Sequence, residues 1–329
     1  MTNLFEYATK ELSQDAFLMW LISNYNYEDQ EVRSASLSLL KELGLPSDLD
    51  SLEVEAQWHK VDIAVFLHAN GEDFALLIED KINSMEHDKQ LERYESILHK
   101  NRPDISDKNI KRLYYKLGKI TDEEAKACGS DWEQWDYRKI ASFFSSFAGS
   151  DNLILKQYAE HTLRIYDEYS RTSIPSSQSS EIYSNAAWDG FFSNVLLPRL
   201  DSRFKVHIGK SNYDYTYMAI YRKDKLESGD KDKGIPYLEI RSRDLIKEEH
   251  GYYCRFLVLA YDVDYNKYKE QLDSLCAKID IRGLSSKSRR KMEPKQLGVI
   301  EPPGYLTEDD VIRSFDEAVN RYFELMEDW

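Results

Sequence analysis

Three charged residues stand together near the end of an apolar run, FALLIEDKI, in the sequence of this chain. They are Glu79, Asp80 and Lys81, and the residues before them have the composition of a buried strand. An unpaired charge in a protein interior costs several kcal/mol or shifts its pKa until the group is neutral. Their position therefore indicates either a paired structural cluster or a site of chemistry.

A short turn brings a further carboxylate to these residues. Asn70-Gly71 separates FALLIEDKI from the preceding apolar run, VDIAVFL, and this dipeptide is the strongest short signal for a two-residue type I′ hairpin turn. In that register Asp62 lies opposite Glu79, with Cβ atoms about 4.5–5.5 Å apart. Side chains alternate between faces of a strand, so Lys81 shares the face of Glu79, and Asp80 points to the other face.

Two carboxylates held side by side repel each other unless a positive group lies between them. A hard divalent cation such as Mg²⁺ would relieve the repulsion, because it takes carboxylate, carbonyl and phosphate oxygens. The main-chain carbonyl of Asp80 is a further candidate ligand. Lys81 could orient a water molecule and stabilise charge on a phosphate. The alternative is an ordinary ion pair at a strand end, in which Lys81 neutralises Asp62 or Glu79, and the hairpin alone leaves both open.

The elements around this hairpin predict a mixed α/β domain. Helical spacing of apolar residues indicates helices within 8–22 and 28–43, the second ending at Gly44. Helices, three strands, a helix, a strand and two helices follow one another, an order typical of a mixed sheet flanked by helices. We expect the later elements at these positions: strands at 51–58, 61–67 and 74–82, a helix at 86–99, a strand at 110–117, and helices near 137–147 and 151–169.

A Ser-rich segment at residues 171–180 predicts a linker between a first domain, 1–170, and a second domain, 181–329. In the second domain we expect a helix, four strands and two helices that cover the sheet, which together predict an α+β domain. Their expected positions are a helix at 183–200, strands at 204–209, 215–223, 235–243 and 253–263, and helices near 265–279 and 307–327.

The bulk composition limits the classes of function. The chain has 329 residues and a formal net charge of −15, whereas phosphate contacts favour clustered Lys and Arg. The basic segment 285–295 is interpreted as a solvated loop. No apolar run is long enough to span a membrane, the N-terminus lacks the features of a signal peptide, and three widely spaced cysteines form no CxxC pair. We therefore expect a cytoplasmic protein without a disulfide framework.

The charged residues resemble the motif of the PD-(D/E)XK nuclease superfamily, which has the restriction-endonuclease-like fold. Asp62, a short hairpin and Glu79-Asp80-Lys81 stand where that motif has its Asp and its E-x-K, with Val61 in place of the frequent proline. Downstream, Gln90 and Tyr94 form a Q-x-x-x-Y pair, as in a bacterial group of this superfamily. The resemblance covers residues 3–170.

This resemblance implies a role for each matching residue. Asp62 and Glu79 would bind Mg²⁺ or Mn²⁺, with the carbonyl of Asp80 as an additional ligand. Lys81 would position the attacking water, and Glu11, on the first helix, would complete the acidic shell. The implied reaction is hydrolysis of a phosphodiester bond.

Four residues are expected to contact the substrate. Gln90 and Tyr94 lie four positions apart and share a helical face, from which they can reach the site or the substrate backbone. His87, one turn earlier, could contact phosphate, although a solvated histidine is the alternative. Lys60 could bind phosphate at the edge of the site, and an ordinary surface lysine is again the alternative.

Further charged and aromatic residues also allow a structural and a functional interpretation. Glu53 and Glu55 are either an exposed strand face or a supplement to the acidic cluster. Glu239 and Arg241 repeat the E-x-K spacing but lack an opposing acid, which indicates a plain strand edge. Alternating tyrosines at 213, 215 and 217 could stack bases, and sheet packing is the preferred interpretation.

The sequence thus predicts a magnesium-dependent deoxyribonuclease that acts on DNA rather than RNA, with a role in bacterial phage defence or DNA processing implied by resemblance. The competing hypothesis is a catalytically idle, nuclease-derived scaffold. In either case residues 181–329 would recognise the substrate, a protein partner or a second copy of the chain.

Overall fold

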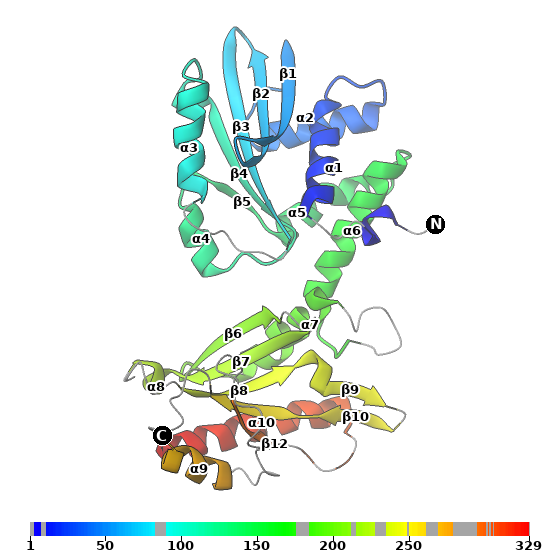
Figure 1. The fold of residues 1–329 in the computed structure, drawn as a ribbon. Helices are drawn as coiled ribbons and strands as arrows, with labels where there is room; N and C mark the ends of the chain where they lie inside the picture. Colours follow the sequence, from blue (N-terminus) through cyan, green and yellow to red (C-terminus); the bar gives the residue numbers. More distant parts are fainter. Residues whose placement is uncertain are drawn as a thin grey trace. The chain divides into compact units, whose positions relative to one another are not determined.

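The computed structural model divides the chain into two compact units, Met1–Tyr166 and Asp167–Trp329 (Figure 1). Each unit has its own sheet and its own buried core. The structure describes the following residues: 3–7, 11–82, 90–175, 184–211, 215–227, 235–248, 250–260, 269–278, 295–300, 302, 304 and 306–328.

A five-stranded mixed sheet in the order β1-β2-β3-β4-β5 forms the centre of the first unit. The first three strands are antiparallel neighbours, and β4 and β5 continue the sheet in parallel. β2 and β3 are buried on both faces, which explains their nearly continuous apolar sequences. The strands are β1 (Ser51–Trp58), β2 (Val61–Ala69), β3 (Glu72–Lys81), β4 (Ile110–Lys116) and β5 (Glu133–Trp135).

Helices cover both faces of this sheet (Figure 1). α1 (Glu11–Ser23), α2 (Gln30–Glu42), α5 (Tyr137–Phe144) and α6 (Leu153–Tyr169) pack on one face, and α3 (Gln90–Asn101) and α4 (Asp122–Cys128) pack on the other. Short 3₁₀ helices complete the unit: η1 (Leu4–Glu6), η2 (Asp107–Asn109) and η3 (Ser145–Phe147). This arrangement confirms the predicted mixed α/β fold class of restriction-endonuclease type.

The predicted hairpin between β2 and β3 is present in the predicted register. The paired residues run from Ala69–Glu72 to Ile63–Ile78. Asn70 and Gly71 both have positive φ, at 55° and 77°, as a type I′ turn requires.

A second two-residue turn, His59-Lys60, joins β1 to β2. It lies between the paired residues Trp58 and Val61, and its φ angles are 48° and 79°. Gln57, the residue before this last pair, also has positive φ, at 51°. Each non-glycine residue in the left-handed region costs roughly 1–2 kcal/mol.

Besides the short 3₁₀ helices η1 and η2, two elements of the first unit have no counterpart in the sequence prediction. α4 begins at a capping box between Thr121 and Glu124, and β5 is only three residues long. The remaining helices and strands lie within a few residues of their predicted positions. The beginning of the helix predicted at 86–99 falls outside the described residues, and α3 is described from Gln90.

The second unit contains a five-stranded antiparallel sheet in the order β12-β11-β8-β7-β6 and a separate β9–β10 hairpin. Side chains of α7, α9 and α10 pack with one face of the larger sheet, which confirms the predicted α+β arrangement. The strands are β6 (Phe204–Lys210), β7 (Thr216–Arg222), β8 (Pro236–Arg241), β9 (Leu245–Glu248), β10 (Gly251–Cys254), β11 (Phe256–Ala260) and β12 (Lys295–Ile300). The helices are α7 (Asn185–Phe191), the π-helical turn η5 (Phe192–Leu196), η6 (Leu197–Arg199), α8 (Lys223–Glu227), η7 (Ser242–Asp244), α9 (Lys269–Lys278), α10 (Glu308–Leu325) and η8 (Met326–Asp328).

The strand predicted at 253–263 is divided in the structure. Residues up to Cys254 pair with β9, and residues from Phe256 pair with β8 and β12. Arg255 stands between them, and its main-chain N–H donates to the carbonyl of Asp244. A single predicted strand therefore contributes to two sheets, which periodicity alone does not indicate.

The described part of the predicted linker packs on the second unit. Ile174 is buried in that core, and its N–H donates to Glu308 Oε1 at 2.9 Å. No helix among the described residues is long and apolar enough to cross a membrane.

Candidate active site

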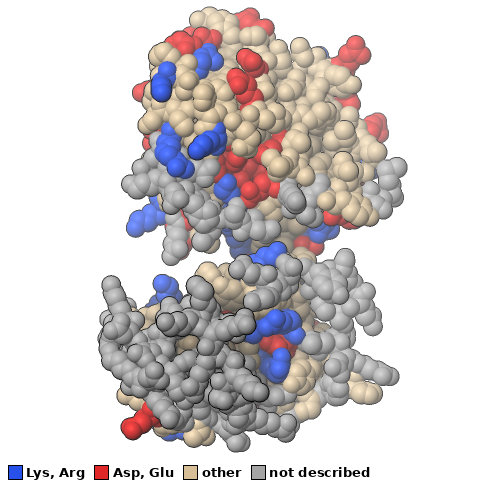
Figure 2. Space-filling model, in the orientation of Figure 1, with Lys and Arg blue, Asp and Glu red and all other residues tan. Residues whose placement is uncertain are grey.

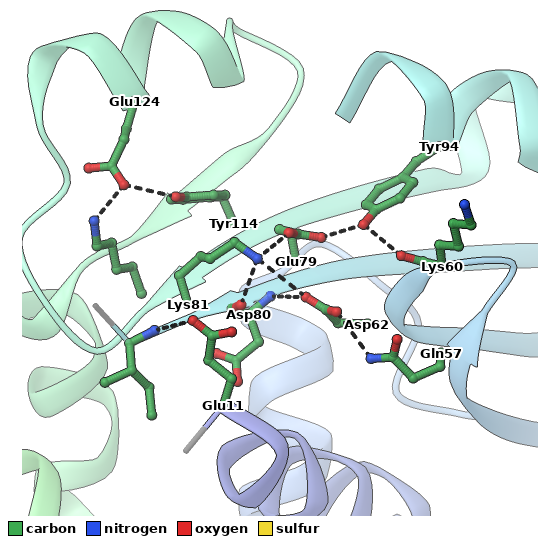
Figure 3. Close-up of polar contacts among 12 residues, drawn as sticks. Glu11, Gln57, Lys60, Asp62, Glu79, Asp80, Lys81, Tyr94, Tyr114 and Glu124 are labelled. Carbon is green, nitrogen blue, oxygen red and sulfur yellow. Dashed lines mark hydrogen bonds and ion pairs between the residues drawn. The ribbon is translucent and has the colours of Figure 1, made fainter. Parts of the chain in front are cut away.

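The charged cluster lies where the ladder between β2 and β3 ends (Figure 3). Asp62 is the residue just beyond Ile63, the last paired residue of β2, and its Oδ2 accepts a hydrogen bond of 3.0 Å from the main-chain N–H of Asp80. The Asp62 carboxylate thus accepts the hydrogen bond of a main-chain N–H where the β2–β3 pairing has ended. The carboxyl end of β3, a strand with a parallel neighbour, is also where α/β proteins place ligand sites.

The Lys81 ammonium lies between the two predicted acids. Its Nζ donates to Glu79 Oε1 and to the carbonyl oxygen of Asp80 at 3.2 Å, and it lies 3.7 Å from Asp62 Oδ2. Glu79 is fully buried, whereas the Asp62 side chain is 18% exposed and remains accessible from solvent. The predicted juxtaposition of three charged side chains on one face is therefore present.

The carboxylates crowd this point with negative charge. Burial, and then the neighbouring Asp62 carboxylate, raise the pKa of Glu79 to about 7, although Lys81 and Tyr94 oppose the shift. Burial lowers the pKa of Lys81, but the carboxylates of Glu79, Asp62 and Glu11 outweigh it and raise the pKa above its usual value. Lys81 consequently stays charged at neutral pH.

Asp80 points to the opposite face of β3, as the alternation predicts, and meets α1. Its Oδ1 accepts a hydrogen bond from Gln14, and burial together with the nearby Asp15 raises the pKa of Asp80 well above its usual range. Burial and the Asp62 charge also raise the pKa of Asp15 to about 6. Sequence reasoning assigned Asp80 only a carbonyl and missed these two partners on α1.

Glu11 is the first residue of α1 and reaches the end of β3. Its Oε1 accepts a hydrogen bond of 3.3 Å from the main-chain N–H of Ile82. The predicted helix-borne acid is thus close to the cluster, and its charge contributes to the raised pKa values of Asp15 and Lys81.

Tyr94 reaches the candidate site itself, one of the two positions predicted for it. It is 1% exposed, and its hydroxyl lies 2.6 Å from Glu79 Oε2 and 2.8 Å from the carbonyl oxygen of Lys60. A buried hydroxyl in this position holds Glu79 and gives little surface to a substrate. Lys60 itself is exposed, at the turn between β1 and β2. His87 lies outside the described residues, and the structure describes the backbone of Gln90 only.

Gln57 is a member of the site that sequence reasoning missed. Its Nε2 donates to Asp62 Oδ1 at 3.1 Å, so both oxygens of that carboxylate are engaged. The register of β1 and β2 places Gln57 opposite Asp62. Gln57 can be identified from the sequence only if the position of the turn between these strands is known. Glu53 and Glu55 pair with Phe66 and Ala64, farther along the strands.

A second buried ion pair lies on the neighbouring strand. Tyr114 pairs with Glu79 and Lys116 pairs with Lys81 in the parallel register of β3 and β4. Glu124 of α4 accepts hydrogen bonds from Lys116 Nζ and from the Tyr114 hydroxyl. This network was not predicted, because α4 itself was not.

The donor set at this point suits a hard divalent cation. Two carboxylates and one main-chain carbonyl, those of Asp62, Glu79 and Asp80, surround a single ammonium, so the acids outnumber the cation that neutralises them. Within the described ranges, no three His, Cys, Asp or Glu side chains form a group that could hold a metal ion. The third protein ligand would therefore be the carbonyl.

Acidic and basic side chains are unevenly distributed on the face of the first unit shown in Figure 2. Figure 2 shows carboxylates gathered in one area on the unit that contains α1 and β1–β5, with Lys and Arg side chains beside them. A negatively charged substrate would approach such a surface only where cations compensate.

The other candidate residues do not form a comparable site. Glu239 bonds to Arg241, and its neighbours on the adjacent strands are Ala219 and Leu257, so no acid opposes it. Tyr217 lies on the face that carries the small cluster of Tyr237, Leu257 and Leu259. Residue 213 and residues 285–294 lie outside the described part of the chain, and Lys295 begins β12.

Comparisons with known proteins agree with the geometry. The profile of the PD-(D/E)XK nuclease superfamily matches residues 2–170, which include every predicted site residue. Searches of curated proteins and of solved structures give no match. Since the profile spans more than half of the chain, this protein belongs to the PD-(D/E)XK nuclease superfamily.

Proposed function

We propose that this protein is a divalent-metal-dependent nuclease that hydrolyses phosphodiester bonds of DNA. The observation that carries the proposal is the position of the Lys81 ammonium between the carboxylates of Asp62 and Glu79. Membership of a nuclease superfamily, whose enzymes generally use divalent metal ions, supports the same chemistry.

The residues divide the work as follows. Asp62 and Glu79, with the carbonyl of Asp80, would hold Mg²⁺ or Mn²⁺. A bound ion of this kind supplies Lewis-acid stabilisation of the phosphate and lowers the pKa of water. Lys81 donates hydrogen bonds from a fixed position and so orients the attacking water, while Glu11 adds to the acidic shell.

The position of each acid is itself held by neighbouring groups. The Tyr94 hydroxyl and the Lys81 ammonium contact different oxygens of Glu79, and Gln57 and the Asp80 N–H contact different oxygens of Asp62. Such partners fix the geometry of metal ligands and are usually worth about 10–100-fold in affinity or activity.

Several finer assignments belong to the same proposal. Residues 1–170 form the catalytic domain, and residues 171–180 link it to the second domain. Residues 181–329 recognise the substrate, a protein partner or a second copy of the chain. The protein acts in the bacterial cytoplasm, in phage defence or DNA processing. Gln90 and His87 contact the substrate near the site.

Cleavage assays test the reaction directly. The purified chain is incubated with plasmid and linear DNA in Mg²⁺, in Mn²⁺ and in EDTA, and we expect cleavage only with metal. The substitutions Asp62→Asn, Glu79→Gln and Lys81→Gln should each lower the rate by about 100-fold or more. Glu239→Gln is the matched control. It alters a buried glutamate that pairs with Arg241 at the same two-residue spacing but has no opposing acid. Cleavage by Glu79→Gln at the rate of the unchanged chain would refute the proposed chemistry.

A second candidate function is a scaffold whose nuclease site is idle. The net charge of −15 favours this alternative, because a nucleic-acid substrate is itself negatively charged. The same assay separates the two: a folded protein that cleaves neither DNA nor RNA with any metal would support the scaffold. Cleavage of RNA alone would assign a ribonuclease.

A further inference from the structure

The turn between β1 and β2 uses residues that are poorly suited to its backbone. His59 and Lys60 both have positive φ, a conformation that favours Asn and Gly, and Gln57 beside them shares it. Left-handed non-glycine residues are uncommon, and they cluster at functional sites because the surrounding structure must hold them.

The same sheet contains a well-suited turn of the same kind. β2 and β3 are joined by Asn70-Gly71, again two residues with positive φ between antiparallel strands. The chain therefore uses the favourable dipeptide at one hairpin and His-Lys at the other. A purely structural turn gives no reason for that difference.

The contacts of the strained turn lead to the candidate metal ligands. The carbonyl of Lys60 lies 2.8 Å from the Tyr94 hydroxyl, which also contacts Glu79. Gln57 donates to Asp62. The turn thus contacts Asp62 through the Gln57 side chain and Glu79 through Tyr94 (Figure 3), whereas the side chains of His59 and Lys60 are exposed.

Charge explains what these exposed side chains can bind. Lys60 makes no ion pair with any residue in the described part of the chain, while the neighbouring site holds several carboxylates. A phosphodiester backbone that approaches this site needs cationic contacts near the acids, and an ammonium and an imidazole both donate to phosphate oxygens.

We propose that the Gln57–Lys60 turn is a preformed binding site for the phosphate backbone of the nucleic acid, adjacent to the scissile bond. Lys60 and His59 bind phosphate oxygens, and Gln57 holds Asp62 in place. The inference rests on the proposed nuclease function and adds a substrate-binding element to it.

An exchange of the two turns tests the inference. The double substitution His59→Asn/Lys60→Gly installs the favourable dipeptide and retains the Lys60 carbonyl that Tyr94 contacts. We expect the midpoint of thermal unfolding to rise by several degrees, because backbone strain is relieved. DNA affinity should fall about tenfold, as expected for a lost charge-assisted contact. The slope of log K against log salt should decrease by about 0.9 for each lost phosphate contact.

Affinity is measured with a fluorescent DNA duplex in Mg²⁺, in the Glu79→Gln background, so that binding is read independently of cleavage. KM and kcat are measured in the otherwise unchanged chain, where KM should rise more than kcat falls. The control is Asn70→His/Gly71→Lys, the reverse exchange at the other hairpin. A Cβ at Gly71 meets no atom within 4 Å, so this control adds backbone strain and the same two side chains without a steric clash, at the end of the β2–β3 ladder away from the candidate metal ligands.

The outcomes distinguish a failure of the phosphate-binding turn from a failure of the proposed nuclease function. If His59→Asn/Lys60→Gly stabilises the chain and leaves DNA affinity unchanged, the turn is an ordinary hairpin and the proposal is overturned. Absence of DNA binding by the parent chain also overturns it. If the chain binds DNA through the turn but cleaves nothing, the binding site stands and the nuclease function fails.

Discussion

The Glu79 carboxylate is held at both of its oxygens. The Lys81 ammonium contacts Oε1 and the Tyr94 hydroxyl contacts Oε2, in a location without solvent access. A buried acid with two donors keeps one orientation, and catalysis by a metal ligand depends on orientation. We therefore expect Tyr94 to act on the proposed reaction through Glu79.

Removal of the Tyr94 hydroxyl should affect activity more than fold. Tyr94→Phe leaves Glu79 Oε2 without a donor, so we expect cleavage to fall about 10–100-fold and the free energy of unfolding to fall by about 1–3 kcal/mol. Cleavage rates and urea denaturation measure the two effects.

The control for this substitution is Tyr158→Phe. The hydroxyl of Tyr158 lies 2.9 Å from that of Tyr115, both side chains are buried, and neither contacts Glu79. Its loss should lower stability without lowering cleavage. Equal losses of cleavage in the two variants would contradict a positioning role for Tyr94.

At this scale, spacing and register predict the central residues of the site. Asn70-Gly71 specifies the hairpin, and the hairpin brings Asp62 to Glu79 and Lys81. The same reasoning misses Gln57, because His59-Lys60 carries no turn signal and the register of β1 is unknown without it. It leaves open whether Tyr94 reaches the site or the substrate, since helical spacing shows a shared face but not whether that face is buried.

Among the elements, α4 shows what sequence patterns leave out. It is seven residues long, too short for a clear periodic signal, and β5 after it has three. Its position depends on Glu124, which caps the helix through Thr121 and pairs with Lys116 of β4. Long elements such as α6 and α10 are predicted well, because many apolar residues repeat at helical spacing.

The Lys116–Glu124 pair predicts an asymmetric response to mutation. Glu124→Gln leaves a buried ammonium without a carboxylate, and we expect it to lower the free energy of unfolding by about 3 kcal/mol or more. The double substitution Lys116→Met/Glu124→Gln removes the ammonium as well and retains an acceptor for the Thr121 N–H. It should cost less than the single substitution, as measured by chemical denaturation. A double variant that is less stable than Glu124→Gln would show that the pair is not the source of the loss.

For the molecule as a whole, the boundary between the two cores lies close to the end of the segment that the family profile matches. The family profile ends at residue 170, and the first compact unit ends at Tyr166, within the last turns of α6. The Ser-rich composition indicates a boundary but not its position, because composition does not reveal that Ile174 is buried in the second core. Multidomain chains with separate cores commonly unfold in more than one step.

Core substitutions in each unit should therefore affect different unfolding transitions. Phe144 and Phe315 are fully buried in the first and second cores, and replacement of a buried Phe by Ala costs about 3–5 kcal/mol. We expect Phe144→Ala to lower the urea concentration at the midpoint of one fluorescence transition. The urea concentration at which cleavage is lost should fall with it. Phe315→Ala should shift the other transition and leave the midpoint for loss of cleavage in place. Trp135 and Trp188, buried in the respective cores, provide the fluorescence signals. A single transition that both substitutions shift equally, with cleavage lost in parallel, would show instead that the two units unfold as one and that activity depends on the second core.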